Sequence, residues 1–423
     1  MRNSMKESGI TWIGNVPSHW QVIPQKYVMH KEKQLCEHYN GEDIISLSMK
    51  GVVRRDLSAG GKMPTTFDGY QYVAPGELLM CLFDIDVTPR CIGLVRDYGV
   101  TSPAYSKFVV HKGYHNAYYD FLLRMIDDGK VFVHLAKNLR SSLTETDFGA
   151  IYTIAPPLDE QIEIASYLEK TCSELDILID ETKKSIGEYK KLKQAVISTA
   201  VMEGVRDKRE MKSCRVEWLS EIPKDWDLIK IKWLLGERKD RSVDGNEEPL
   251  SMSQKFGLIP TKDMDRVPNM ASSFVGAKLV KVGDLVFNKL KAHLGVFAVS
   301  QYDGLVSPDY AVYYPTGHAN MKFLEYLFKT PQYIAEFKKK SSGVGAGLTR
   351  LYTGDLFSIY CALPSLDEQE EIVQYLEKKC TEMDTLIIKK EQIVSELEQY
   401  KKSLIYEYVT GKKEVPTNVG SNR

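Results

Sequence analysis

Basic and polar side chains gather in turn-like segments at matching places in the two halves of this 423-residue chain. Side chains of these types hydrogen-bond to nucleic-acid phosphates and base edges. The candidates in the first half are Lys50, Arg54, Arg55, Lys62, Arg90 and Arg140, with Tyr105 beside them. Those in the second half are Ser253, Gln254, Lys255, Lys262, Asn288, Lys289, Lys291 and Arg350, with Tyr310. The simpler interpretation of any one of them is a solvated surface charge.

The total charge does not favour non-specific nucleic-acid binding. The chain has 56 basic and 57 acidic residues, a formal net charge of −1. Domains that bind nucleic acid usually carry an excess of lysine and arginine. If DNA is the ligand, positive charge must therefore be local or be supplied by a partner.

The sequence lacks the signatures of several enzymes. Gly60-Gly61-Lys62 and residues 343–347 do not have the form of a phosphate-binding loop. Ala155-Pro156-Pro157-Leu158 is not the Asn/Asp-Pro-Pro-aromatic segment that an adenine methyltransferase needs. The eight histidines are scattered and form neither an H-E-x-x-H pair nor a Ser-His-Asp arrangement. We therefore expect no catalytic residue and no metal site in this chain.

The cysteines and the apolar runs indicate a cytoplasmic protein. Seven cysteines are scattered without a C-x-x-C spacing, which favours reduced thiols over disulfides or zinc. The first residues have no apolar core typical of a signal peptide. No run approaches the roughly 20 apolar residues that span a bilayer.

The chain repeats itself once, which sets its organisation. Residues 158–176 and 366–384 are identical at 13 of 19 positions without a gap, at a shift of 208. Weaker echoes link residues 12–20 with 218–226, and 102–105 with 307–310. The close copies suggest one shared role, and the diverged segments between them suggest two ligands or two versions of one ligand. An old duplication that drifted freely is the alternative.

The two close copies begin long helices with an apolar seam. Apolar side chains step by four and three residues, which is the a/d pattern of a coiled coil. The predicted seam consists of Leu168, Leu175, Ile179, Ile186, Tyr189, Val196, Leu376, Met383, Ile387, Val394, Leu397 and Leu404. Polar residues interrupt the two copies, at Thr182 and Lys193 in the first and at Lys390 and Lys401 in the second. Roughly 44 residues would give a helix of about 65 Å. We expect the two helices to pair antiparallel; packing on the adjacent domain, or homodimerisation, is the alternative.

These patterns predict an α+β fold with a pseudo-two-fold internal repeat, in which two similar α/β domains are separated by the paired helices. The domains are expected at residues 1–157 and 206–364, with spacer helices at 158–205 and 365–412 and a flexible tail at 413–423. Short β-type runs such as 71–73, 285–287 and 310–314 precede helix-like stretches at 118–127 and 321–340.

The sequence resembles the specificity subunits of type I restriction-modification systems. The resemblance rests on the opening residues 9–20, on Pro156-Pro157-Leu158-Asp159-Glu160-Gln161 with Ile164, and on the closing residues 405–411. It covers nearly the whole chain. The second copy departs slightly, because Leu363-Pro364-Ser365 replaces Ala155-Pro156-Pro157.

The resemblance implies a non-catalytic, DNA-binding targeting subunit. Each domain would be a target-recognition domain that reads one half of a split, asymmetric DNA site. The helix pair would set the unread gap and dock modification subunits, with two copies expected, which carry S-adenosylmethionine and methylate adenine. Motor-nuclease restriction subunits, with ATP and Mg, would join for cleavage. This chain itself would hold no cofactor and would not contact a membrane.

Two other interpretations remain open at this point. A coiled-coil scaffold that binds only protein would share the repeat and the helices. A self-contained restriction and methylation enzyme is disfavoured by the missing methyltransferase and nuclease segments.

Overall fold

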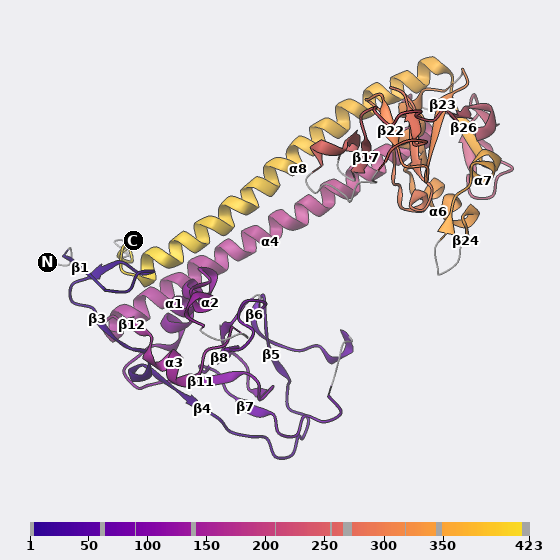
Figure 1. Cartoon of the computed structure of the whole chain (residues 1–423). Coiled ribbons are helices and arrows are strands. Elements are labelled where there is room, and N and C mark those ends of the chain that lie inside the picture. Colours follow the sequence, from indigo (N-terminus) through magenta and orange to yellow (C-terminus); the bar gives the residue numbers. More distant parts are fainter. Residues whose placement is uncertain are drawn as a thin grey trace. The chain divides into compact units, whose positions relative to one another are not determined.

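The computed structural model describes residues 4–59, 64–88, 90–136, 141–207, 209–253, 256–264, 273–317, 319–343 and 349–416. The chain divides into two compact units: unit 1 comprises Met1–Lys183 and Gln392–Arg423, and unit 2 comprises Lys184–Glu391. Two long helices, α4 (Leu158–Glu203) and α8 (Leu366–Val409), contribute a segment to each unit. Figure 1 shows these helices in magenta-pink and yellow. The predicted fold class is confirmed; the exact domain boundaries stay a prediction.

A four-stranded antiparallel sheet forms the centre of each globular part. In unit 1 its order is β4 (Met29–Glu32), β11 (Ser106–Val110), β8 (Leu78–Met80) and β9 (Ile92–Leu94). In unit 2 the order is β16 (Leu235–Glu237), β23 (Tyr310–Pro315), β20 (Leu285–Asn288) and β21 (Phe297–Val299). The central strand β8 reads Leu-Leu-Met and is buried on both faces, as expected of a strand covered from both sides.

The remaining strands form antiparallel pairs around this sheet. In unit 1 the pairs are β1 (Met5–Glu7) with β2 (Asn15–Pro17), β3 (Gln21–Pro24) with β12 (Tyr152–Ala155), β5 (Ile45–Ser48) with β6 (Gly51–Arg54), and β7 (Gln71–Val73) with β10 (Gly99–Thr101). In unit 2 they are β13 (Met211–Ser213) with β14 (Glu221–Pro223), β15 (Asp227–Lys230) with β26 (Tyr360–Leu363), β17 (Leu250–Ser253) with β18 (Gly257–Pro260), and β19 (Lys278–Val280) with β22 (Gly304–Val306). Unit 2 adds the short pair β24 (Ser342–Gly343) and β25 (Thr349–Arg350).

Short helices complete each unit. Unit 1 contains α1 (Asn116–Asp128), α2 (Val131–Leu135), α3 (Glu145–Ala150), and the 3-10 turns η1 (Gln25–Tyr27) and η2 (Leu57–Ala59). Unit 2 contains α5 (Met321–Phe328), α6 (Pro331–Lys340), α7 (Thr353–Ser358), η3 (Ile231–Trp233), η4 (Thr261–Asp263) and η5 (Ala292–Leu294). The helix-like stretch expected at 321–340 is therefore two helices. Pro331 causes the break, because a proline disfavours helical backbone at the residue before it and then begins the next helix well.

Each core is completed by the end of one long helix and the start of the other. In unit 1, the start of α4, through Leu168, and the end of α8, through Leu404, enter the main buried cluster. In unit 2 the roles reverse, because Ile197 near the end of α4 and Leu376 near the start of α8 enter the corresponding cluster. The helices are therefore parts of the two cores as well as spacers.

Within each unit α4 and α8 run antiparallel. All twelve residues of the predicted seam are buried or half-buried. In unit 1, Asp176 and Lys183 of α4 form ion pairs with Lys401 and Glu398 of α8 at 2.6 and 2.8 Å. The chain direction of α8 is thus opposite to that of α4.

The helix segments of unit 2 repeat this charge pattern. Lys190 and Lys193 of α4 pair with Glu391 and Asp384 of α8 at 3.0 and 2.6 Å. The pair Asp384–Lys193 is Asp176–Lys401 shifted by 208 residues. The polar residues at the predicted seam positions Lys193 and Lys401 therefore have carboxylate partners on the opposite helix.

Candidate nucleic-acid interface

The turn of the β5–β6 hairpin in unit 1 carries Lys50. Its backbone N–H donates to the Ser48 hydroxyl at 3.2 Å, and its side chain is exposed. Behind the turn, the Arg90 guanidinium donates to the carbonyls of Met49 at 2.9 Å and Ile92 at 3.2 Å. Burial lowers the pKa of Arg90. Arg90 therefore holds the hairpin turn, and the turn presents the Lys50 ammonium to solvent.

The far end of the same hairpin places Arg54 and Arg55 in different surroundings. Arg54 lies between the carboxylates of Asp43 at 3.0 Å and Asp97 at 2.9 Å, and both raise its pKa. Burial raises the pKa of the Tyr105 phenol, and the positive charge of Arg55 acts against this rise. Arg55 therefore lies near Tyr105. Two carboxylates offset the positive charge of the Arg54 guanidinium and occupy some of its five N–H donors. Arg54 is therefore a weaker candidate for DNA contact than Lys50.

Tyr105 and Tyr310 occupy matching places beneath the hairpins of the two units. Tyr105 packs against a small buried cluster made of Ile45, Val73, Leu79 and Val95. Tyr310 packs against the corresponding cluster, made of Leu250, Leu258, Val280, Val286, Val306 and Val312. Burial raises the pKa of both phenols, so both are neutral hydrogen-bonding groups near neutral pH.

Four candidates of unit 2 come together where β20 and β25 end and β23 begins. Asn288 ends β20 and lies opposite Tyr310 of β23 in the sheet register. The backbone N–H of Leu351 donates to the carbonyl of Lys289 at 3.0 Å, which holds Lys289 beside the strand of Arg350. The structure thus joins residues that are about 60 positions apart in the sequence.

This cluster has more positive than negative charge. Burial lowers the pKa of Lys289, and the like charges of Lys278 and Arg350 lower it further. Two carboxylates offset these three cations: Asp309 lies 3.1 Å from Arg350, and Glu237 lies 3.4 Å from Lys278. The buried Nε of Arg350 has no hydrogen-bond partner among the described residues. The Arg350 side chain as a whole is 24% exposed, so part of it is open to an anion such as a phosphate or to an acceptor on a base edge.

The other candidates of unit 2 lie on separate segments. The Ser253 hydroxyl at the end of β17 accepts from the backbone N–H of Phe256 at 3.2 Å. Lys262 pairs with Glu248 at 3.1 Å, and Lys291 is exposed just before η5. Four more candidates lie outside the described residues: Lys62, Arg140, Gln254 and Lys255.

The repeated Glu-Gln motif has a role that the sequence alone does not reveal. In unit 1, Glu160 accepts from the Trp20 indole N–H at 2.8 Å and lies 2.8 Å from His19. Gln161 donates to the carbonyl of Pro156 at 2.7 Å and accepts from the backbone N–H of His115 at 2.8 Å. The motif therefore fixes the start of α4 to the last strand, to the first helix and to Trp20.

Unit 2 repeats this junction. Glu368 accepts from the indole N–H of Trp226 at 3.2 Å and from Arg209 at 2.6 Å. Gln369 donates to the carbonyl of Pro364 at 2.9 Å and accepts from the backbone N–H of Asn320 at 2.8 Å. The signal was present in the sequence as the co-occurrence of the tryptophan and the Glu-Gln pair in both halves, but their contact needed the fold.

No group of three or more His, Cys, Asp or Glu side chains that could hold a metal is found among the described residues. Within the same residues, no helix is both long and apolar enough to cross a membrane. All seven cysteines are free thiols.

Comparisons with known proteins give a consistent relationship. No protein-family model matches the chain. The predicted type I restriction enzyme MjaX specificity subunit of Methanocaldococcus jannaschii is 25% identical over 436 residues, covering 96% of each chain. The type I restriction enzyme MjaVIII specificity subunit of the same organism is 24% identical over 273 residues, 61% of each chain.

Solved structures share the fold. A chain solved in work on complex assembly and conformational transition of the type I R-M system has a TM-score of 0.70 at 14% identity, covering 94% of this chain and 99% of that one. The HsdS subunit from Thermoanaerobacter tengcongensis has a TM-score of 0.52 at 15% identity, covering 94% and 98%. The full-length sequence similarity, the shared fold and the internal repeat agree. The chain is similar to specificity subunits of type I restriction enzymes over nearly its whole length.

Proposed function

We propose that this chain is a non-catalytic subunit that reads a split, asymmetric DNA target, with one half-site for each unit. The observation that carries the proposal is a contrast within the repeat. Both units use the same sheet, the same junction and a tyrosine beneath the hairpin β5–β6 or β17–β18. The polar side chains next to these elements differ. Unit 1 has Lys50 and Arg55 at the two ends of the hairpin, and unit 2 has Asn288, Lys289 and Arg350 at neighbouring strand ends. Equal frames with different hydrogen-bonding groups suit two different short sequences.

In this proposal the helix pair sets the unread gap. Recognition modules that read half-sites one DNA turn apart must be separated by about 34 Å or a multiple. Helix α4 has 46 residues, about 69 Å at ~1.5 Å per residue, so it is long enough for this role.

The helix pair would also dock two copies of a modification subunit. Exposed apolar side chains recur on it at positions related by the shift of 208: Leu158 and Leu366, Leu178 and Leu386, Leu192 and Tyr400. Their exposed fractions are similar, between 41% and 54%. Solvent-exposed apolar groups on a helix pair favour a protein partner. Because the set occurs twice, once in each unit, two copies of one partner fit it best.

The chemistry would belong to the partners. The modification subunits would carry S-adenosylmethionine and methylate adenine, and restriction subunits would add ATP- and Mg-dependent translocation and cleavage. With a net charge of −1, this chain would leave many of the phosphate contacts to them.

Deletion of the chain from its host, followed by genome-wide mapping of methylated adenine, tests the proposal. We expect a split methylated site to vanish and to return when the chain is restored. Unchanged methylation would reject DNA reading and would favour a protein scaffold.

A further inference from the structure

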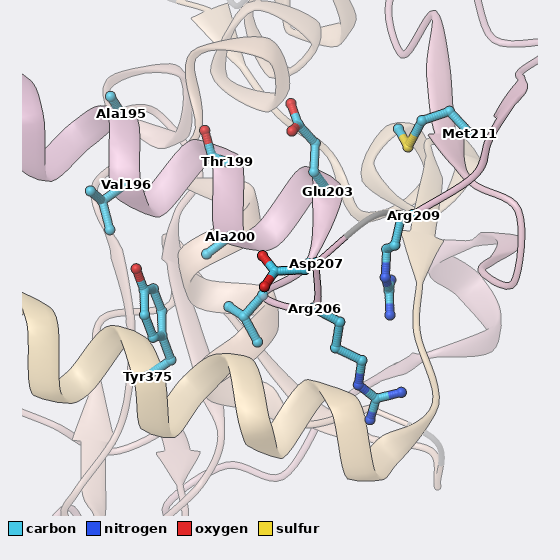
Figure 2. A pocket seen from close by; sticks show the side chains of 12 residues that line it. Ala195, Val196, Thr199, Ala200, Glu203, Arg206, Asp207, Arg209, Met211 and Tyr375 are labelled. Atoms are coloured by element: carbon cyan, nitrogen blue, oxygen red, sulfur yellow. The ribbon is translucent and has the colours of Figure 1, made fainter.

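A pocket of about 570 Å³ lies in unit 2 between the last turns of α4 and the start of α8. Figure 2 shows Val196 and Ala200 of α4 facing Tyr375 of α8 across this pocket. Glu203 and Asp207 lie on its rim, where α4 gives way to the following segment. The proposed function does not use this pocket.

The internal repeat explains why the pocket exists. At a shift of 208, Tyr375 corresponds to Tyr167, and Ala200 corresponds to Tyr408. In unit 1 the rings of Tyr167 and Tyr408 pack together, with centroids 4.7 Å apart and hydroxyl oxygens at 3.5 Å. The space that the Tyr408 ring fills in unit 1 is therefore left open in unit 2 by the methyl group of Ala200.

Ala200 and Tyr408 are equivalent only if α4 and α8 turn the same side toward their cores at these positions. The burial of the neighbouring residues shows that they do. Ile197 and Val201 flank Ala200 and are buried, as are Ile405 and Val409 on either side of Tyr408. Because α4 and α8 are continuous helices, the ungapped register of their first turns extends to these positions. The pocket thus has the shape of a seat for a phenol ring stacked on Tyr375.

The charged residues at the rim of the pocket indicate which residues would flank an aromatic side chain bound in it. Neither Glu203 nor Asp207 forms an ion pair with any residue that the structure describes. The nearby guanidinium of Arg206 is bonded to Glu371 at 2.8 Å, and that of Arg209 to Glu368 at 2.6 Å. The C-terminal end of α4 adds partial negative charge. This rim repels phosphate and attracts lysine or arginine.

We propose that the pocket binds an aromatic side chain flanked by basic residues, supplied by the modification subunit that docks on unit 2. This inference rests on the proposed function. It makes the two docking places unequal, because unit 1 fills the corresponding space with its own Tyr408. The modification subunit on unit 2 would therefore be held by one additional anchor.

The variant Ala200→Tyr tests the proposal by placing in unit 2 the ring that unit 1 already has. We expect the full chain to fold with an unchanged or higher melting temperature, since the pocket is filled as in unit 1. Titration of the purified modification subunit should show one of its two binding steps weakened at least tenfold, with the other unchanged. Gln194→Tyr is the matched control, because Gln194 is exposed on α4 and does not line the pocket.

A second variant tests the rim. Glu203→Gln with Asp207→Asn should weaken the same binding step and reduce its salt dependence, while leaving the melting temperature unchanged. Equal binding by wild type and Ala200→Tyr would overturn the pocket proposal and leave docking intact. Equal losses in Ala200→Tyr and Gln194→Tyr would overturn it too, because the loss would then come from the helix surface. If the wild-type chain binds no modification subunit, the proposed docking on the helix pair is wrong, and the modification subunit cannot be the occupant of the pocket.

Discussion

The two units hold their long helices in the same way and present different polar side chains near the hairpins β5–β6 and β17–β18 and the adjoining strand ends. At the junctions, Trp20 and Trp226 donate to Glu160 and Glu368 through the same indole atom. Away from the junctions, unit 1 keeps Arg54 of its β5–β6 hairpin bonded to two carboxylates, whereas unit 2 has a cluster of three cations and two carboxylates around Lys289. The contrast teaches that this repeat preserves the contacts which orient the helices and varies the groups which can meet a ligand.

An acidic side chain in the turn before a central strand shows how much can change inside the preserved frame. Glu77 and Asp284 occupy the same turn before the central strand, and each accepts from a backbone N–H of that turn at 2.7 or 2.8 Å. Unit 1 neutralises Glu77 with Lys107 of β11 at 3.1 Å. Unit 2 neutralises Asp284 with Arg238, which follows β16, at 2.6 Å. The requirement for a counter-charge is kept although the residue that supplies it has moved to another strand.

The largest effect should come from breaking the junction of unit 2. The side chain of Glu368 is 2% exposed, so Glu368→Ala would leave Arg209 and the Trp226 indole without their acceptor. Removing one partner of a buried ion pair costs about 3–5 kcal/mol of folding free energy. Urea denaturation measures the loss, and hydrogen exchange would locate it in unit 2.

The matched change in unit 1 sharpens the comparison. The side chain of Glu160 is 22% exposed and bonds to the exposed His19 and to Trp20, so Glu160→Ala should cost less, about 1–2 kcal/mol. Glu368→Gln keeps an acceptor for Trp226 and should fall between the two. Equal losses at Glu160 and Glu368 would show that the buried charge at Glu368 is not what distinguishes the junctions.

The next effect should appear in DNA binding. Arg350→Gln removes a guanidinium from the cluster of unit 2 and should weaken binding to the cognate site roughly 10- to 100-fold, because direct base contacts contribute on this scale. Lys289→Met removes a like charge from that cluster, so it should not lower folding stability, and it should reduce the salt slope of binding by about one. Fluorescence anisotropy over a range of salt concentrations measures both. An unchanged affinity in both variants would remove this cluster from the interface.

A smaller effect concerns the choice of helix partner. Lys183 and Lys190 lie on α4, and Glu398 and Glu391 lie opposite them on α8. Two copies of α4 in the same antiparallel register would place lysine against lysine, so these pairs favour pairing between α4 and α8. Lys183→Glu with Lys190→Glu should lower the melting temperature, because each lost ion pair contributes about 1 kcal/mol or less to the free energy of unfolding. Reversing Glu391 and Glu398 to lysine in the same chain should restore it; failure of that rescue would show that the pairs do not select the partner.

The smallest effect is expected at Arg54. Because Asp43 and Asp97 already bond its guanidinium, Arg54→Ala should change DNA affinity less than threefold. Lys50→Ala, at the exposed turn of the same hairpin, should weaken binding more. A larger loss at Arg54 than at Lys50 would mean that the two aspartates release Arg54 to the DNA.

Periodicity predicted the parts of the fold that depend on local sequence. The a/d pattern predicted the long helices and their apolar seam, and the duplicated segments predicted two units of the same architecture. The break between α5 and α6 was missed although Pro331 signals it, because the apolar pattern continues across the proline. Sheet order could not be derived, since it depends on pairings such as β4 with β11, whose residues are about 75 positions apart.

The candidate interface was predicted only as residue types in turn-like segments. The sequence does not show which arginine side chains already have hydrogen-bond partners within the protein. Arg54 and Arg90 each donate to a residue more than 40 positions away, Asp97 and Met49 respectively. The sequence also could not show that Lys289, Arg350 and Tyr310 lie together. They lie at the ends of three separate strands, which only the folded sheet brings side by side. The Glu-Gln motif was recognised by its repetition, and its contact with the tryptophans became visible only in the fold.

Exchange of residues 1–157 for the corresponding residues of another specificity subunit tests the central claim most directly. The hybrid would be expressed with its modification subunit, and methylated adenine would be mapped across the genome. The account predicts a new sequence in one half of the split site, with the gap and the other half unchanged. Methylation that changes in both halves, or in neither, would contradict it.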